Sequence, residues 1–121
     1  MKVRDYKDLV IWQKSIDYAL EIYHLTASFP VEERFGITSQ IRRAAVSVSS
    51  NIAEGEGRAT TRDYLNFLSH SRGSLRESGS LLHLSGRLGF VTLEQARTAE
   101  ALAVEIGKMN STMRAKLSSK L

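Results

Sequence analysis

The chain has 121 residues, enough for one domain with a hydrophobic core of its own. Hydrophobic residues make up 42% and charged residues 25%, which is typical of a globular protein and excludes a disordered one. There is no cysteine, so disulfides, thiolate metal sites and cysteine nucleophiles are excluded; no apolar run is long enough for a signal peptide or a membrane span. We therefore expect a cytoplasmic protein.

The first predicted helix covers residues 8–28. Apolar residues recur in it at alternating spacings of three and four, the pattern of a bundle seam. This seam consists of Leu9, Trp12, Ile16, Ala19, Tyr23 and Thr26, and Leu20 and Ala27 widen it. Phe29-Pro30 ends the helix, because the residue before a proline avoids the helical conformation.

The second predicted helix covers residues 37–55 and carries two stripes side by side. The apolar stripe consists of Ile37, Ile41, Ala44, Val48 and Ile52. The polar stripe consists of Gln40, Arg43, Ser47, Asn51 and Glu54. A surface helix usually has one apolar stripe and a charged back, so this mostly uncharged second stripe predicts burial on more than one side. The helix ends at Gly55-Glu-Gly57, where a glycine can take the left-handed cap conformation.

Two further helices are predicted at residues 61–88 and 92–118. The first has a seam in which large residues alternate with serine: Tyr64, Leu68, Ser71, Leu75, Ser78, Leu82 and Ser85. Three glycines inside it, Gly73, Gly79 and Gly86, are interpreted as sites of close helix contact or bending.

The seam of the last helix consists of Leu93, Ala96, Ala99, Leu102, Ile106, Met109, Met113 and Leu117. Basic residues near its C-terminal end, Lys108 among them, suit the helix dipole. Thr60 or Thr61 and Thr92 are the expected N-caps, and Gly89 is the expected C-cap. Four helices with short connections predict an all-α, antiparallel up-down-up-down four-helix bundle.

The net charge is +4, and it is unevenly distributed. Residues 1–35 hold five basic and six acidic side chains, whereas residues 36–121 hold twelve basic and seven acidic ones. A basic excess favours an acidic partner such as nucleic acid, and arginine suits phosphate contacts as well as carboxylate pairs. The candidate nucleic-acid-binding residues are Arg42, Arg43, Arg58, Arg62, Arg72 and Arg76.

Several motifs occur in order along the chain: Asp8-Leu-Val-Ile-Trp-Gln-Lys14, Phe29-Pro-Val-Glu-Glu33, Ser39-Gln-Ile-Arg-Arg-Ala-Ala-Val-Ser47, Asn51-Ile-Ala-Glu-Gly55, Gly57-Arg58, Gly73-Ser-Leu-Arg-Glu77 and Leu88-Gly-Phe90. Together they resemble the four-helix-bundle family of 23S rRNA intervening-sequence proteins. The family also includes accessory proteins of diversity-generating retroelements. The resemblance implies a homopentameric ring, and for the retroelement members it implies binding to nucleic acid and to a reverse transcriptase. The family commonly has a proline where this chain has Ser49, so we expect a straighter second helix here.

We expect a non-enzymatic, homo-oligomeric protein, with nucleic acid as a partner and a reverse transcriptase as a further partner if it is retroelement-associated. The alternative is a scaffold ring that binds protein and no nucleic acid. No nucleophile motif or phosphate loop occurs, and Glu21-Ile-Tyr-His24 lacks the second such motif that a di-iron bundle needs, so no catalytic residue, cofactor or metal is predicted. The subunit-interface candidates are Gln40, Arg43, Ser47, Asn51, Glu54 and Glu77. Glu54 and Arg58 have the spacing of a helical ion pair.

Overall fold

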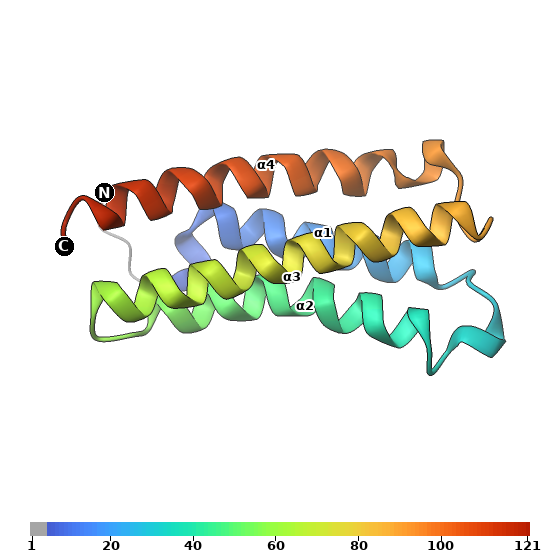
Figure 1. Ribbon diagram of the computed structural model, residues 1–121, viewed down its shortest axis with the longest axis horizontal. Helices are drawn as coiled ribbons and strands as arrows, with labels where there is room; N and C mark the ends of the chain where they lie inside the picture. Colours follow the sequence, from blue (N-terminus) through green and yellow to red (C-terminus); the bar gives the residue numbers. More distant parts are fainter. Residues whose placement is uncertain (1–4) are drawn as a thin grey trace.

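The computed structural model describes residues 5–121 and has four long helices packed as a bundle. They are α1 (Val10–Thr26), α2 (Ile37–Glu56), α3 (Thr61–Arg87) and α4 (Leu93–Ser118). Two short 3-10 helices, η1 (Tyr6–Asp8) and η2 (Val31–Glu33), precede α1 and α2. Consecutive helices run in opposite directions, as predicted (Figure 1). Each helix packs against two others, α4 closes the bundle against α1, and α2 and α3 pack together most closely.

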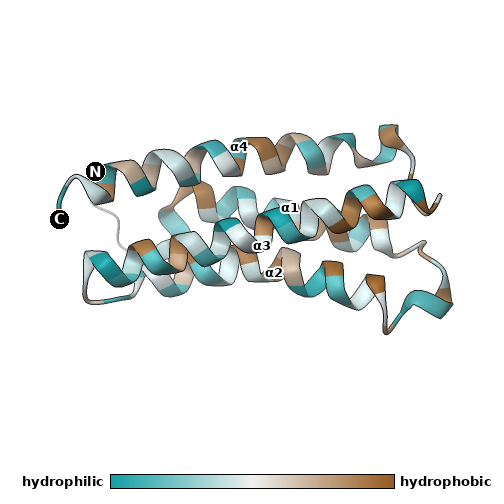
Figure 2. Ribbon diagram, viewed as in Figure 1, coloured by the Kyte–Doolittle hydropathy of each residue, from teal (hydrophilic) through white to brown (hydrophobic). Residues whose placement is uncertain are grey.

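The core is built from one apolar stripe on each helix, and Figure 2 shows these residues recurring in brown along the ribbons. On α2 the predicted stripe from Ile37 to Ile52 is buried throughout. On α3 the predicted seam is buried from Leu68 to Ser85, with Tyr64 packed against its edge. The seam of α4 is buried at Ala96, Ala99 and Ile106, but Leu93 is 86% exposed. The spacing of large and small residues therefore identified the core face of α2 and α3.

The predicted seam of α1 is mostly wrong. The fully buried residues of α1 are Ile11, Ser15, Tyr18, Ile22, Leu25 and Thr26, of which only Thr26 belonged to the prediction. Leu9 and Trp12 of the predicted seam pack against the edge of the core, but Leu20 is 64% exposed and Tyr23 is 44% exposed. The sequence around α1 carries two rows of apolar residues with the same spacing, so periodicity alone could not choose between them.

Small residues let α2 and α3 approach closely. A Cβ atom on Gly55 would lie 2.9 Å from Cβ of Phe67 and 3.0 Å from the ring of Tyr64. The hydroxyl of Ser71 donates a hydrogen bond of 2.8 Å to the Val48 carbonyl across the same interface. The side chain of Ser49 instead bonds within α2, donating to the Val46 carbonyl at 3.0 Å, and α2 is continuous past it. Gly55 is thus a packing residue inside the helix.

The expectations about glycine were otherwise mostly wrong. Gly57 ends α2 with φ of −80°, so this cap is not left-handed. A Cβ atom on Gly73 or Gly79 would meet no atom within 4 Å, so neither glycine marks a close contact within the chain. Gly89 does have a positive φ, 83°, and it turns the chain between α3 and α4 as predicted. The side chains of Thr60 and Thr92 cap α3 and α4.

None of the helices within residues 5–121 combines the length and the hydropathy that a membrane crossing requires.

Candidate nucleic-acid and subunit surfaces

The polar stripe of α2 lies along a shallow surface groove of about 410 Å³. Four of its five residues line the groove, namely Arg43, Ser47, Asn51 and Glu54. Tyr23 from α1 and Val46 and Ser50 from α2 complete the lining. The stripe therefore forms one continuous surface, and Gln40 and the α3 residue Glu77 are exposed outside the groove.

Part of the polar stripe is held by α3 of the same chain. The Ser74 hydroxyl donates to the Ser47 hydroxyl at 2.9 Å. The Asn51 amide donates to the same hydroxyl at 2.9 Å and to the Ser47 carbonyl at 2.8 Å. These three side chains are half-buried. A neighbouring subunit is thus not needed to provide Ser47 and Asn51 with hydrogen-bond partners, although both side chains still line the open groove.

Glu54 and Arg58 form the expected ion pair, with 3.1 Å between the guanidinium and the carboxylate. Arg58 also lies over the ring of Phe67, 4.5 Å from its centroid. The side chains of the pair are 60% and 45% exposed, for Glu54 and Arg58 respectively. An exposed pair of this kind contributes about 0.3–0.5 kcal/mol to a helix. The pair is therefore a minor source of stability within the chain.

The six candidate arginines do not form one patch. Arg42 joins α2 to α1: its guanidinium donates to the Thr26 hydroxyl at 2.7 Å and stacks 4.5 Å from the centroid of the Tyr23 ring. Arg43 and Arg58 lie along α2 and its C-terminal end, and Arg62 is exposed in the first turn of α3. A guanidinium already engaged by a ring and by a hydroxyl or carboxylate is less free to hold phosphate, so Arg42 and Arg58 are weaker candidates than the others.

Arg72, Arg76 and Lys108 line one surface groove together. This groove, of about 780 Å³, lies between α3 and α4. Its other lining residues are Leu75, Ala103, Val104, Gly107, Ser111 and Thr112. No carboxylate lines it, and none of the three cations is ion-paired with another described residue. The groove is therefore a concave surface with an uncompensated positive charge on both walls.

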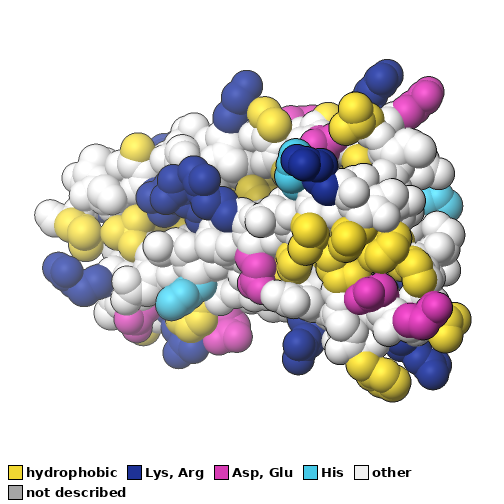
Figure 3. All heavy atoms as spheres, turned by 45° about the vertical axis from the view of Figure 1, so that its right-hand side comes forward, with side chains coloured by type: hydrophobic (Ala, Val, Ile, Leu, Met, Phe, Trp, Pro, Cys, Tyr) yellow, Lys and Arg dark blue, Asp and Glu magenta, His cyan; other side chains and the backbone are white. Residues whose placement is uncertain are grey.

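Hydrophobic side chains form one large cluster in the right half of the face shown in Figure 3, whereas Lys and Arg side chains are spread over both halves. Leu84 of α3 is 47% exposed, and Leu88, which directly follows α3, is 52% exposed.

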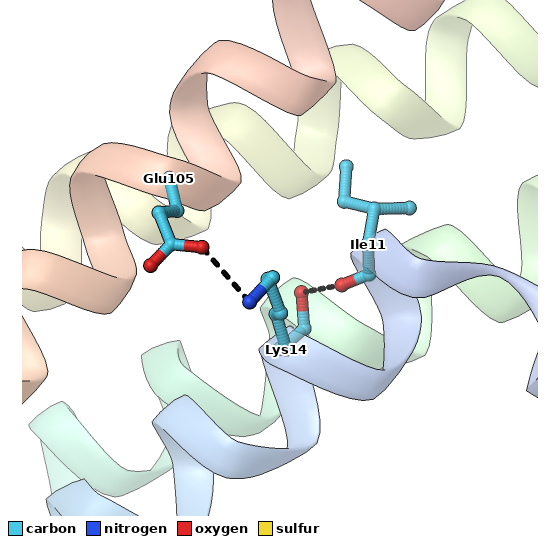
Figure 4. A network of polar contacts seen from close by, with 4 residues as sticks. Ile11, Lys14 and Glu105 are labelled. Carbon is cyan, nitrogen blue, oxygen red and sulfur yellow. Dashed lines mark hydrogen bonds and ion pairs between the residues drawn. The ribbon is translucent and has the colours of Figure 1, made fainter.

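The carboxylate nearest in sequence to Lys108 is directed away from the groove. Glu105 forms an ion pair with Lys14 of α1, with 2.8 Å between carboxylate and ammonium (Figure 4). The hydrogen bond and the charge of Glu105 raise the pKa of Lys14 above its ordinary value. This contact ties α4 to α1 and places the acidic charge on the α1 side of α4. It helps to leave the α3–α4 groove without acidic side chains.

Lys108 was missed as a site residue because positive charge near a helix C-terminus had a simpler explanation in the helix dipole. Asn110 was also missed. It is 1% exposed, its amide donates to the Leu68 carbonyl of α3 at 2.9 Å, and its oxygen accepts from Arg114 at 2.7 Å. The available signal was its position four residues after Ile106, inside an apolar seam, where a polar side chain needs a partner.

Tyr18 forms a second buried polar contact that was missed. Its phenol lies 2.7 Å from the Ser78 hydroxyl, across the bundle from α1 to α3. Ser78 donates its own proton to the Leu75 carbonyl at 2.9 Å, so it accepts from Tyr18. Burial raises the pKa of the Tyr18 phenol above its ordinary value. Tyr18 and Asn110 are structural residues that connect opposite or adjacent helices through the core.

Glu21 and His24 lie together in a small depression with Leu25, Ser28 and Gln95. Across residues 5–121, no three or more His, Cys, Asp or Glu side chains are grouped closely enough to hold a metal ion.

Comparisons with known proteins agree with this arrangement of helices. Residues 7–112 match the family model described as 23S rRNA-intervening sequence protein. The crystal structure of a protein of unknown function from the S23 ribosomal protein family of Bacteroides thetaiotaomicron VPI-5482 is similar, with a TM-score of 0.78 and 26% sequence identity. The similarity covers 87% of this chain and 98% of that one. Among curated proteins none matches significantly. The chain belongs to the 23S rRNA-intervening sequence protein family.

Proposed function

We propose that this protein is a non-enzymatic accessory protein that assembles with copies of itself and binds nucleic acid through its basic surface. The observation that carries the proposal is the α3–α4 groove, where Arg72, Arg76 and Lys108 converge without a carboxylate among the lining residues. Cations that lack a protein partner are free to neutralise phosphates, and each phosphate contact releases counterions and stabilises the complex. Such binding is tolerant of sequence and sensitive to salt.

The proposed assembly is a homopentameric ring, and its interface would use the exposed ends of the α2 stripe. Arg43 and Glu77 are the strongest candidates. They lie on neighbouring helices, each about one turn from the Ser47–Ser74 hydrogen bond, and both are exposed. Neither forms an ion pair with a residue in the described part of the chain. A ring uses two different patches of each subunit, so this patch of one copy would meet a different patch of the next. Each added copy also repeats the basic groove.

The second candidate function is a ring that binds another protein and no nucleic acid. Exposed apolar residues favour it, in particular Leu84 and Leu88 at the C-terminal end of α3 and Val31 and Phe35 before α2. Phe35 is 88% exposed, and large exposed hydrophobic side chains often mark protein contacts. A reverse transcriptase would be such a partner if retroelement genes flank the gene for this chain.

Size-exclusion chromatography coupled to light scattering, run with and without a short RNA at low and high salt, tests both proposals. An oligomer that co-elutes with RNA at low salt and releases it at high salt supports nucleic-acid binding. An oligomer that never co-elutes with RNA favours the protein-binding ring. A monomer under every condition contradicts the assembly.

A further inference from the structure

The α3–α4 groove combines two kinds of surface that a nucleic acid would meet differently. Its positive charges come from both walls, with Arg72 and Arg76 on α3 and Lys108 on α4. Between these walls lies aliphatic surface, in which Leu75 is nearly buried and Val104 is 57% exposed. Charge alone would suit any polyanion. The aliphatic surface between the charges would be buried only by a ligand that also presents a flat apolar face.

Unpaired bases can expose such a face, whereas the faces of paired bases are covered by stacking. In a duplex the bases are stacked inside and the phosphates form the outer surface, so the aliphatic part of the groove would stay empty. Single strands can turn bases onto an apolar surface while the backbone follows a basic groove.

We propose that the α3–α4 groove binds single-stranded nucleic acid, with phosphates held by Arg72, Arg76 and Lys108 and a base placed against Leu75 and Val104. This inference rests on the proposed nucleic-acid function and narrows it to unpaired strands. Ser111 and Thr112 line the same groove and offer hydroxyls to the backbone. Gly107 lines the groove as well, and a Cβ atom there would lie 3.8 Å from the Leu75 side chain.

The test measures fluorescence anisotropy of a labelled single strand, of either oligo-dT or oligo-U, and of a labelled duplex of the same length across a salt series. We expect the single strand to bind at least about fivefold more tightly than the duplex, a small preference because aliphatic side chains replace the aromatic rings of stronger sites. For a single strand, the slope of log affinity against log salt should be about −0.7 per phosphate contacted, or about −2 for three cations.

Three variants locate the binding. Val104→Glu places a carboxylate in the groove at an exposed position and lowers the net charge by one. Arg34→Ala, the control, lowers the net charge by the same amount in the connection between α1 and α2, where Arg34 stacks on Phe35. Gly107→Leu fills the groove without changing charge. We expect Val104→Glu and Gly107→Leu to weaken single-strand binding about tenfold, a loss of the order that one or two base or phosphate contacts explain. Arg34→Ala should retain near wild-type affinity. Circular dichroism verifies that each variant is folded.

The outcomes separate this inference from the function on which it rests. Equal affinity for single strand and duplex, with the salt slope intact, overturns the single-strand inference and leaves nucleic-acid binding standing. Equal losses in Val104→Glu and Arg34→Ala also overturn it, because net charge alone would then set the affinity. If ATP displaces the labelled strand as effectively as the unlabelled strand does, the single-strand inference is overturned, and the groove is instead a site for mononucleotides. No binding of either probe at low salt contradicts the proposed function itself.

Discussion

The two flanks of α3 use small residues to opposite effect. Toward α2, Gly55 lets Phe67 and Tyr64 pack against its backbone, and serine hydroxyls bond across the interface. Toward α4, Gly107 lies opposite Leu75 but leaves a groove between the helices, with cations on both walls. A small residue permits close approach only where the neighbouring helix has side chains that fill the space. The α2 flank is therefore closely packed, whereas the α4 flank leaves the groove at which we propose that nucleic acid binds.

The largest expected effect on stability comes from adding a side-chain atom to the closely packed interface between α2 and α3, the tight flank of α3. Gly55→Ala places a Cβ atom 2.9 Å from Cβ of Phe67, a distance that forces the helices to shift. Overpacking of this kind costs about 1–3 kcal/mol, which urea unfolding would measure.

The matched control is Gly73→Ala on α3, where the new Cβ atom meets nothing within 4 Å. Alanine is the better helix former, so this variant should be more stable than the wild type by up to about 1 kcal/mol. Equal effects of the same sign at Gly55 and Gly73 would contradict the account of the tight flank.

The next effect concerns the buried contact between α1 and α3. Tyr18→Phe removes the hydrogen bond to Ser78 and should lower the free energy of unfolding by about 1 kcal/mol at neutral pH. Burial raises the folded-state pKa of Tyr18 above the ordinary 10.0, so the unfolded chain loses this proton first as pH rises. Tyr18 therefore contributes stability below pH 10.0 that is lost above it.

Thermal melts of both proteins at neutral and alkaline pH measure this dependence. The stability gap between wild type and Tyr18→Phe should narrow at alkaline pH, because groups common to both proteins cancel in the difference. A gap that widens with rising pH would contradict the assigned environment of Tyr18.

The smallest expected effect on the isolated chain is that of Glu54→Ala. Its ion pair with Arg58 is exposed, so its loss should cost no more than about 0.5 kcal/mol in a dilute sample. Assembly can respond more strongly, since a charge buried between subunits and left without its partner costs several kcal/mol. Light scattering across a dilution series separates the two effects. A large destabilisation already present in the monomer would contradict the exposed pair.

The proposed contact between copies has its own test. Arg43→Glu and Glu77→Arg each reverse a charge on the patch that is proposed to meet the next copy, so each should weaken assembly, as measured by light scattering. An oligomer mass that stays unchanged in both variants would contradict the use of this patch.

Most of the fold follows from sequence, and the exceptions have physical causes. The alternation of leucine and serine in α3 and the apolar stripe of α2 predicted faces that the structure confirms, whereas the polar stripe of α2 lies along an open groove with Gln40, Arg43 and Glu54 exposed. In α1 two apolar rows shared one spacing, and the choice between them depends on tertiary packing. Lys108 could not be chosen over other basic residues, because its role depends on which helix faces α4. The Glu54–Arg58 pair was predicted because both residues lie on one helical turn.

The central claim is that nucleic acid binds at the α4 flank of α3 and not along α2. A salt-series binding titration of one labelled single strand tests it most directly, with Arg76→Ala/Lys108→Ala compared against Arg43→Ala/Arg58→Ala. Both double variants lose the same charge. The account predicts that the groove variant loses affinity and flattens the salt slope by about 1.4, at about 0.7 per phosphate contact, while the α2 variant keeps the wild-type slope. A flattened slope in the α2 variant with an unchanged slope in the groove variant would contradict it.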